Sequence, residues 1–163
     1  MRFLATTCVF SESIKPRPHP SFSRFVSTNT LVLSGETLID VQRGILRIAQ
    51  CDPEKAQRLR NWLMEAKDRW PIIEGREREK SKILAEMLEC RPLKYLWMPE
   101  PRAASPTFQY PIAIAAAAIA YDLPIAGYGL GPYTVIDSYF KLPGLFDART
   151  EAWFGTHKRS SAA

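Results

Sequence analysis

Apolar residues recur with the spacing of an α-helix directly after residue 34. Leu38, Val41, Ile45 and Ile48 lie three or four positions apart, which places them on one helical face. Ser34 precedes this stripe, and its hydroxyl can accept a hydrogen bond from a free backbone N–H group of the first turn. The pattern therefore predicts an amphipathic helix that begins after Ser34.

A second helix has the clearest start in the chain. Asp52 is a good N-cap, and Pro53 suits the first helical position. Apolar residues then follow at spacings of three and four from Ala56 to Trp70, while charged side chains occupy the other face. Pro71 cannot continue the helix. We therefore predict a second amphipathic helix that ends at Trp70.

A third helix has two unequal halves. We expect it to begin near Ile73 or Glu74, and its first half is almost entirely charged. Its second half, from Ile83 to Leu88, is apolar at four positions. Pro92 sets the limit of this helix.

Residues 111–136 form a long run in which Asp122 is the single charged residue. Its length would suffice to cross a bilayer, so a membrane span and a helix pair docked on a membrane are alternatives. A central carboxylate would cost about 2.5–3.5 kcal/mol on insertion, and the alanines between residues 113 and 118 supply little hydrophobic drive. We therefore favour a buried alanine-rich helix at residues 112–121.

Two shorter aromatic helices are predicted after this one. Pro132 favours the start of a helix at residues 133–141. Asp147 can cap a last helix at residues 148–154, which Gly155 would end. The glycines of residues 127–131 lack the spacing of phosphate-binding loops, so we interpret this segment as a turn.

These patterns together predict a mainly α fold. It consists of three amphipathic helices, a proline-rich connector, and then alanine-rich and aromatic helices. The alternative is an α+β fold with a minor two-stranded element, because residues 30–33 and 95–98 are rich in β-prone side chains.

Thirteen prolines divide the 163 residues into segments. The predicted segments are a flexible N-terminal tail or targeting segment at residues 1–33, a charged helical region at 34–98, a proline-rich connector at 99–111, an apolar aromatic helical region at 112–155 packed on the charged one, and a tail at 156–163.

The composition is that of a globular protein, with 46% apolar and 24% charged residues. It excludes a wholly disordered chain, a collagen-like fibre and a many-pass membrane protein. The net charge of +5 is spread thinly. Basic and acidic residues alternate between residues 76 and 82, which is typical of a solvated helix face. Nucleic-acid binding and contact with a membrane surface are therefore secondary possibilities for the partner.

The three cysteines have no pair at metal-binding spacing, and the chain has only two histidines. We therefore predict neither a metal site nor a cofactor. Reduced thiols indicate an intracellular, reducing compartment. Residues 1–30 are basic and rich in Ser and Thr, so organellar targeting or export by a secretion system stays open.

Polar groups that could perform general acid–base chemistry gather near the end of the chain. Asp147, Arg149 and His157 are the candidate catalytic residues of a small hydrolase or transferase. No nucleophile motif or paired carboxylates accompany them, and capping of the predicted last helix is the simpler explanation of Asp147.

The sequence favours a non-enzymatic helical protein that acts through protein–protein interaction or self-association. Aromatic side chains are enriched at protein interfaces, and the candidate interaction residues are Trp62, Trp70, Tyr128 and Tyr133. The alternatives are a peripheral membrane protein that binds through residues 111–136 and the small enzyme described above.

Overall fold

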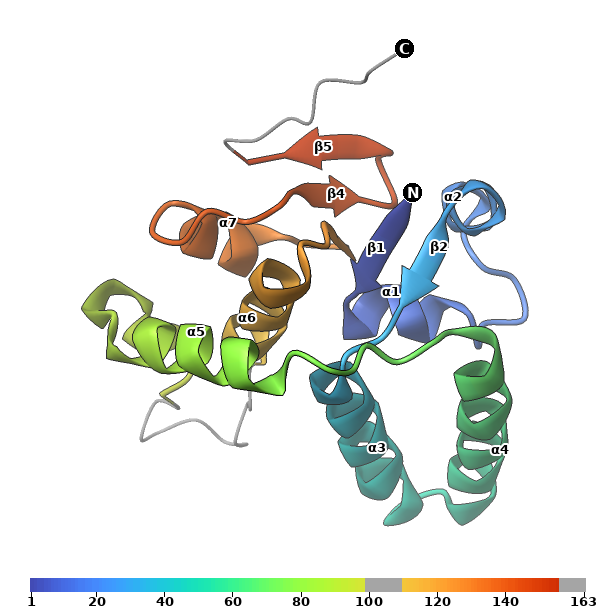
Figure 1. Cartoon of the computed structure of the whole chain (residues 1–163). Coiled ribbons are helices and arrows are strands. Elements are labelled where there is room, and N and C mark those ends of the chain that lie inside the picture. Colours follow the sequence, from blue (N-terminus) through green and yellow to red (C-terminus); the bar gives the residue numbers. More distant parts are fainter. Residues whose placement is uncertain (99–109, 156–163) are drawn as a thin grey trace.

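The computed structural model describes residues 1–98 and 110–155 of the chain. Helices and strands are interspersed along it (Figure 1). Their order is β1 (Arg2–Ala5), α1 (Thr7–Glu12), α2 (Pro20–Thr28), β2 (Thr30–Val32), α3 (Gly35–Ala49), α4 (Pro53–Arg69), α5 (Glu77–Glu89), the 3-10 helix η1 (Arg91–Leu96), α6 (Pro111–Tyr121), β3 (Ile125–Gly127), α7 (Gly131–Asp137), β4 (Leu145–Asp147) and β5 (Ala152–Phe154).

The described strands form one sheet in the order β2-β1-β3-β4-β5. The strands from β2 to β4 are parallel, and β5 runs antiparallel to β4. Strand β1 pairs on one side with β2, where Phe3 is opposite Leu31, and on the other side with β3, where Leu4 is opposite Ile125. The first residues of the chain therefore lie inside the sheet.

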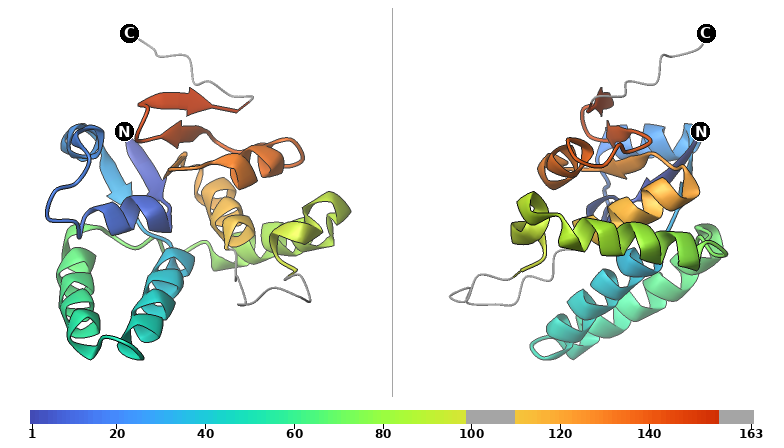
Figure 2. Two further views of the ribbon diagram at one scale, coloured as in Figure 1. Left: turned by 180° about the vertical axis from the view of Figure 1, so that it is seen from behind. Right: turned by 60° about the vertical axis from the view of Figure 1, so that its left-hand side comes forward.

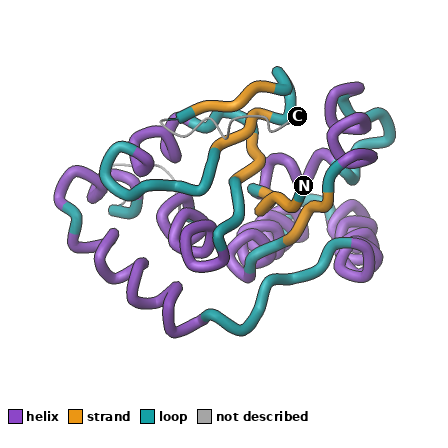
Figure 3. Tube along the Cα trace, turned by 45° about the horizontal axis from the view of Figure 1, so that its top comes forward, coloured by secondary structure: helices purple, strands orange, loops and turns teal. Residues whose placement is uncertain are grey.

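Side chains of each strand alternate between the two faces of the sheet, and helices cover both faces (Figure 3). Leu4 and Ile125 point into a core formed with α5, η1, α6 and α7, which we call the α6-side core. Phe3, Leu31 and Ala126 point into a core formed with the helices from α1 to α4, which we call the α3-side core. Burial on both faces is characteristic of parallel sheets.

The predicted helix starts at Ser34 and Asp52 are confirmed. The Ser34 hydroxyl accepts a hydrogen bond from the Thr37 N–H at 3.2 Å, and α3 begins at the next residue after Ser34. The Asp52 carboxylate accepts one from the Lys55 N–H at 2.9 Å, and α4 ends as predicted at Trp70, its C-cap.

Helices α3 and α4 run side by side and project away from the sheet (Figures 1 and 2). We call these two helices and the turn between them the α3–α4 arm. Its base packs into the α3-side core through residues such as Val41 and Ala66, while Leu46 and Met64 are exposed farther out.

Helix α5 begins later than predicted, at Glu77. The residues before it are used otherwise: Ile72 forms a parallel β-bridge with Leu33, and Gly75 has a φ of 99°. A φ in this range does not belong to a right-handed helix. The helix therefore starts only after this glycine.

The alanine-rich helix is confirmed as a buried element. Helix α6 has 11 residues, of which those from Ile114 to Ala118 are all buried, and it ends at Asp122 in the left-handed conformation. In the described part of the chain, no helix has the length and apolarity needed to cross a membrane.

The predicted last helix at residues 148–154 is wrong. Asp147 ends β4, the chain turns through Glu151 with a φ of 54°, and β5 pairs back on β4 with Phe154 opposite Leu145. Helix α7, with Pro132 in its first turn, confirms the preceding short helix but is shorter than predicted.

The mainly α class is also wrong, because the sheet makes this an α+β fold. The alternative is partly matched: residues 30–32 form β2, whereas residues 95 and 96 belong to η1. Residues 1–33 are not a flexible tail, because they form β1, α1, α2 and β2. The predicted connector, apart from residues 110 and 111, and the predicted tail at 156–163 lie outside the described residues.

Candidate functional site

The carboxyl ends of the parallel strands are the first place to search for a site. From β1 the chain moves to β2 on one side, and it later adds β3 on the other side of β1. Sheets of this kind bind ligands at such a reversal of strand order, outside the carboxyl ends of the strands. Thr6 follows β1 and Tyr128 follows β3, so these residues lie at the reversal.

At this end of the sheet, hydrogen bonds connect the residues that follow β1 with the end of β3 and the loop after it. The Thr6 hydroxyl donates to the Ala126 carbonyl at 3.0 Å and lies 3.1 Å from the Cys8 sulfur. The same sulfur accepts a hydrogen bond from the Tyr128 N–H at 3.2 Å. A Cβ atom on Gly127 would lie 2.5 Å from Leu130 Cδ2 and 3.1 Å from the Thr6 hydroxyl, so a larger residue here would require the Leu130 side chain to move.

The first turn of α3 is fastened to the same end of the sheet. The Thr37 hydroxyl donates to the Ala5 carbonyl at 3.0 Å and is fully buried. Ser34, which is also buried, lies 3.2 Å from the Thr37 hydroxyl. The hydroxyl groups at the ends of β1 and β2 are therefore engaged in holding the fold together.

Tyr128 and Arg149 form the outer part of this region. The Arg149 guanidinium carbon lies 4.8 Å from the centre of the Tyr128 ring, a cation–π geometry. Burial is the main cause that raises the pKa of Tyr128 to about 12, and the negative charge of Glu12 is the second cause. Its hydroxyl is buried and forms no hydrogen bond with the described residues.

Glu12, Asp40 and Asp147 are acidic residues close to this region. Burial is the main cause that raises the pKa of Tyr133, and the charges of Cys8 and Asp40 raise it further. Among the residues that the structure describes, no three His, Cys, Asp or Glu side chains are grouped so that they could hold a metal ion. A metal centre of that kind is thus not formed by residues 1–98 and 110–155.

The candidate catalytic residues meet only in part. Asp147 and Arg149 share the turn between β4 and β5, but Asp147 Oδ1 accepts hydrogen bonds from the N–H groups of Arg149 and Thr150 at 2.7 and 3.1 Å. Asp147 therefore caps the turn between β4 and β5 and is not the N-cap of a helix that the sequence predicted. His157 lies outside the described residues, and the acid–base role of these three residues stays a prediction.

The candidate interaction residues are mostly part of the core. Trp62 and Trp70 pack against Phe10 with ring centres 4.8 and 5.0 Å apart. Tyr133 is buried in the α6-side core, and Tyr128 is half-buried at the carboxyl end of the sheet. Trp62 and Trp70 also line a small pocket of about 200 Å³, and Trp70 in addition lines a larger open groove.

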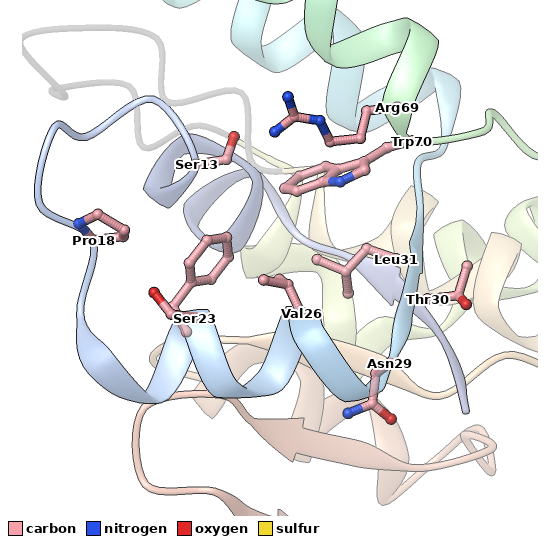
Figure 4. A pocket seen from close by; sticks show the side chains of 10 residues that line it. Ser13, Pro18, Ser23, Val26, Asn29, Thr30, Leu31, Arg69 and Trp70 are labelled. Carbon is pink, nitrogen blue, oxygen red and sulfur yellow. The ribbon is translucent and has the colours of Figure 1, made fainter.

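This groove lies between α2, β2 and the end of α4, and we call it the α2 groove (Figure 4). Its volume is about 510 Å³. Phe22 and Trp70 are almost fully buried and form an aromatic floor, whereas Ser23 and Arg69 are exposed at the rim. Its lining residues are Ser13, Pro18, Phe22, Ser23, Val26, Asn29, Thr30, Leu31, Arg69 and Trp70.

Comparisons with solved structures find a similar fold in other proteins. No protein-family model and no curated protein sequence matches the chain. A chain of the crystal structure of FitAcB from Neisseria gonorrhoeae is similar, with a TM-score of 0.61 and 17% identity over 91% of this chain and 98% of that one.

Two further solved structures have the same degree of similarity. One is the crystal structure of VapBC2 from Rickettsia felis bound to a promoter DNA fragment. A chain of this structure has a TM-score of 0.60 and 17% identity over 82% of this chain and 91% of that one. A chain of VapBC-1 from nontypeable Haemophilus influenzae has a TM-score of 0.60 and 15% identity over 85% and 94%. At these identities the similarity concerns the fold.

Neither the hydrogen bonds of Thr6 and Cys8 nor the α2 groove could be predicted from the sequence pattern. Thr6 and Thr7 interrupt the apolar stretch at residues 3–10, and this interruption proves to be the junction of β1 and α1. It was the one local signal. The partners of Thr6 and Cys8 lie 120 residues away in the chain, so no local pattern could reveal them.

Proposed function

We propose that this chain is a non-enzymatic interaction protein that holds a segment of a partner protein in the α2 groove. The observation that carries this proposal is the aromatic floor of Phe22 and Trp70 beneath an open, polar rim with Arg69. Tryptophan and arginine are enriched among the residues that dominate binding energy at interfaces. A buried apolar centre with a polar rim is also the usual anatomy of such interfaces.

Two further points support an interaction role. At the carboxyl end of the sheet, Thr6, Thr37 and Cys8 take part in hydrogen bonds that hold the fold together, and among the described residues none of these side chains is hydrogen-bonded to a basic side chain. The similar chains come from structures named VapBC2, VapBC-1 and FitAcB, and one of these structures includes DNA. A protein partner is therefore the leading interpretation, and DNA is a second partner class for the experiment to separate.

The first test is site-specific photo-crosslinking in cells that express the protein natively. A benzophenone amino acid is placed at Val26, which lines the groove, and as a control at Ser27, which is exposed on the same helix outside the groove. We expect a covalent adduct with one defined protein at position 26 and none at position 27. Nucleic acid in the adduct, or the absence of any adduct, would contradict the proposal.

The second test uses the purified partner and calorimetry. A bulky cation at position 26 fills the groove, so Val26→Arg is expected to weaken binding about tenfold or more, which corresponds to about 1.4 kcal/mol. Ser27→Arg adds the same charge one residue further along α2 and should leave the affinity unchanged. Equal loss in both variants would indicate a charge effect and would count against the groove.

A further inference from the structure

The α3–α4 arm exposes several large apolar side chains. Leu46 on α3 is 61% exposed and Met64 on α4 is 65% exposed. Ile39, 46% exposed, lies seven positions before Leu46, so the two side chains share a face of α3. Exposed apolar side chains that gather in one place, unlike scattered ones, mark interaction sites.

Of these side chains, Leu46 and Met64 line a second groove, which runs between α3 and α4 and which we call the arm groove. Its volume is about 450 Å³. Residues 57, 60, 64 and 67 of α4 line it, with the three- and four-residue spacing of one helical face. All its lining residues belong to the arm: Gln42, Ile45, Leu46, Gln57, Arg60, Asn61, Leu63, Met64 and Lys67.

The charge of the arm groove has one sign. Arg60 and Lys67 are its charged lining residues, and both are cations. In the described part of the chain neither forms an ion pair, and the Arg60 guanidinium only donates a long hydrogen bond of 3.4 Å to Gln57. An occupant with carboxylates beside its apolar face would supply the missing partners.

We propose that the arm groove binds an acidic amphipathic α-helix of a partner protein. A groove between two helices accepts the ridge of a third helix, with apolar anchors at positions i, i+3, i+4 and i+7. Met64 suits this role, because its flexible thioether adapts to different apolar anchors. Glutamates that flank the anchors would meet Arg60 and Lys67.

A second copy of this chain fits the arm groove less well. In a two-fold symmetric dimer the same patch lies on both sides of the interface. Arg60 and Lys67 would then approach their own counterparts, and like charges at an interface are costly. The site is separate from the α2 groove, so the two proposals can fail independently.

The test uses phage-displayed helical peptides with fixed apolar anchors and flanking positions randomised between Glu and Lys. Selection on the full-length protein is expected to enrich Glu at the flanks. A synthetic peptide of the selected sequence should bind the protein, and binding should weaken about tenfold or more in Met64→Asp. It should be unaffected in Val26→Arg, because Val26 lines the α2 groove and is not among the lining residues of the arm groove. The proposal would be overturned if selection enriched Lys at the flanking positions or enriched neither residue. It would also be overturned if Met64→Asp bound the selected peptide as tightly as the wild type does.

A matched pair of charge reversals tests the role of the cations. Arg60→Glu removes a cation that lines the groove and should weaken binding of the Glu-rich peptide about tenfold. Arg58→Glu makes the same change on α4 outside the lining residues and should leave binding within about twofold. Both residues are exposed, so neither change disturbs the core. Sedimentation of the free protein completes the test, since a dimer that Met64→Asp dissociates would identify a second copy as the occupant.

Discussion

At the scale of single residues, Glu12 shows how one buried charge organises a loop. It is the sole acidic residue among the first 35 and is only 4% exposed. Its carboxylate accepts hydrogen bonds from Lys15 Nζ at 2.6 Å and from the His19 N–H at 3.0 Å. His19 is the N-cap of α2, so Glu12 connects the end of α1 to the start of α2 and thereby positions one wall of the α2 groove.

The ionisation of Glu12 predicts a pH dependence of stability. The hydrogen bond from Lys15 lowers the pKa of Glu12 from its ordinary value of 4.5. A carboxyl group with a lowered pKa stabilises the folded state above its unfolded pKa, and this contribution disappears as the pH falls through the folded pKa. We therefore expect the free energy of unfolding to decrease below pH 4.5, and Glu12→Gln to reduce this decrease.

The same variant has an expected effect at neutral pH. Because Lys15 loses its charged acceptor, Glu12→Gln should cost about 1–3 kcal/mol of stability at pH 7. Urea unfolding at a series of pH values measures both effects. Glu86→Gln, at an exposed position of α5, serves as the control. If the free energy of unfolding fell equally steeply below pH 4.5 in the wild type and in Glu12→Gln, the ionised Glu12 side chain would not be the source of the pH dependence.

At the scale of elements, caps made some helices predictable, while the strands were not. Ser34, Asp52 and Pro53 act within three residues of their position, so the starts of α3 and α4 could be read locally. Strands such as β1 and β3 have three or four residues and contribute side chains to cores on both faces. Such a strand shows no alternation of apolar and polar residues, and periodicity cannot distinguish it from a buried helix.

The candidate sites were predictable to the same limited extent. Asp147 and Arg149 could be nominated together because they lie two residues apart, but the helix that Asp147 was expected to cap is a turn followed by β5. The α2 groove joins α2 to the end of α4, more than 35 residues later in the chain. Trp70 could be nominated as an aromatic interaction residue, but its position beside Phe22 depends on the sheet, which the sequence pattern did not reveal.

The integration of β1 into the sheet gives a prediction for this element. Leu4 is fully buried in the α6-side core, so Leu4→Ala should lower the free energy of unfolding by about 2–5 kcal/mol. Arg2 is exposed on the same strand, and Arg2→Ala should change it by less than about 0.5 kcal/mol. Chemical denaturation of both variants measures the difference. Equal stability of Leu4→Ala and the wild type would mean that the first residues form a tail after all.

At the scale of the whole molecule, the sheet joins parts of the chain that the sequence suggested were separate. The charged helical region at residues 34–98 and the apolar region at 112–155 have different compositions. In the structure, β1 lies between β2 and β3. Leu4 and Ile125 belong to the α6-side core, whereas Phe3 and Ala126, their neighbours in the same strands, belong to the α3-side core. Neither core can open fully while these two strands stay paired.

This shared sheet predicts one cooperative unfolding unit, which native-state hydrogen exchange can measure. Ala116 in α6 reports on the α6-side core and Val41 in α3 on the α3-side core. Ile125→Ala removes buried side-chain atoms from the α6-side core and should cost about 2–5 kcal/mol. Because the strands link both cores, we expect the exchange free energies at Ala116 and Val41 to fall by the same amount. A loss confined to Ala116 would show that the α3-side core is stable without the sheet, and the chain would then consist of two units that unfold separately.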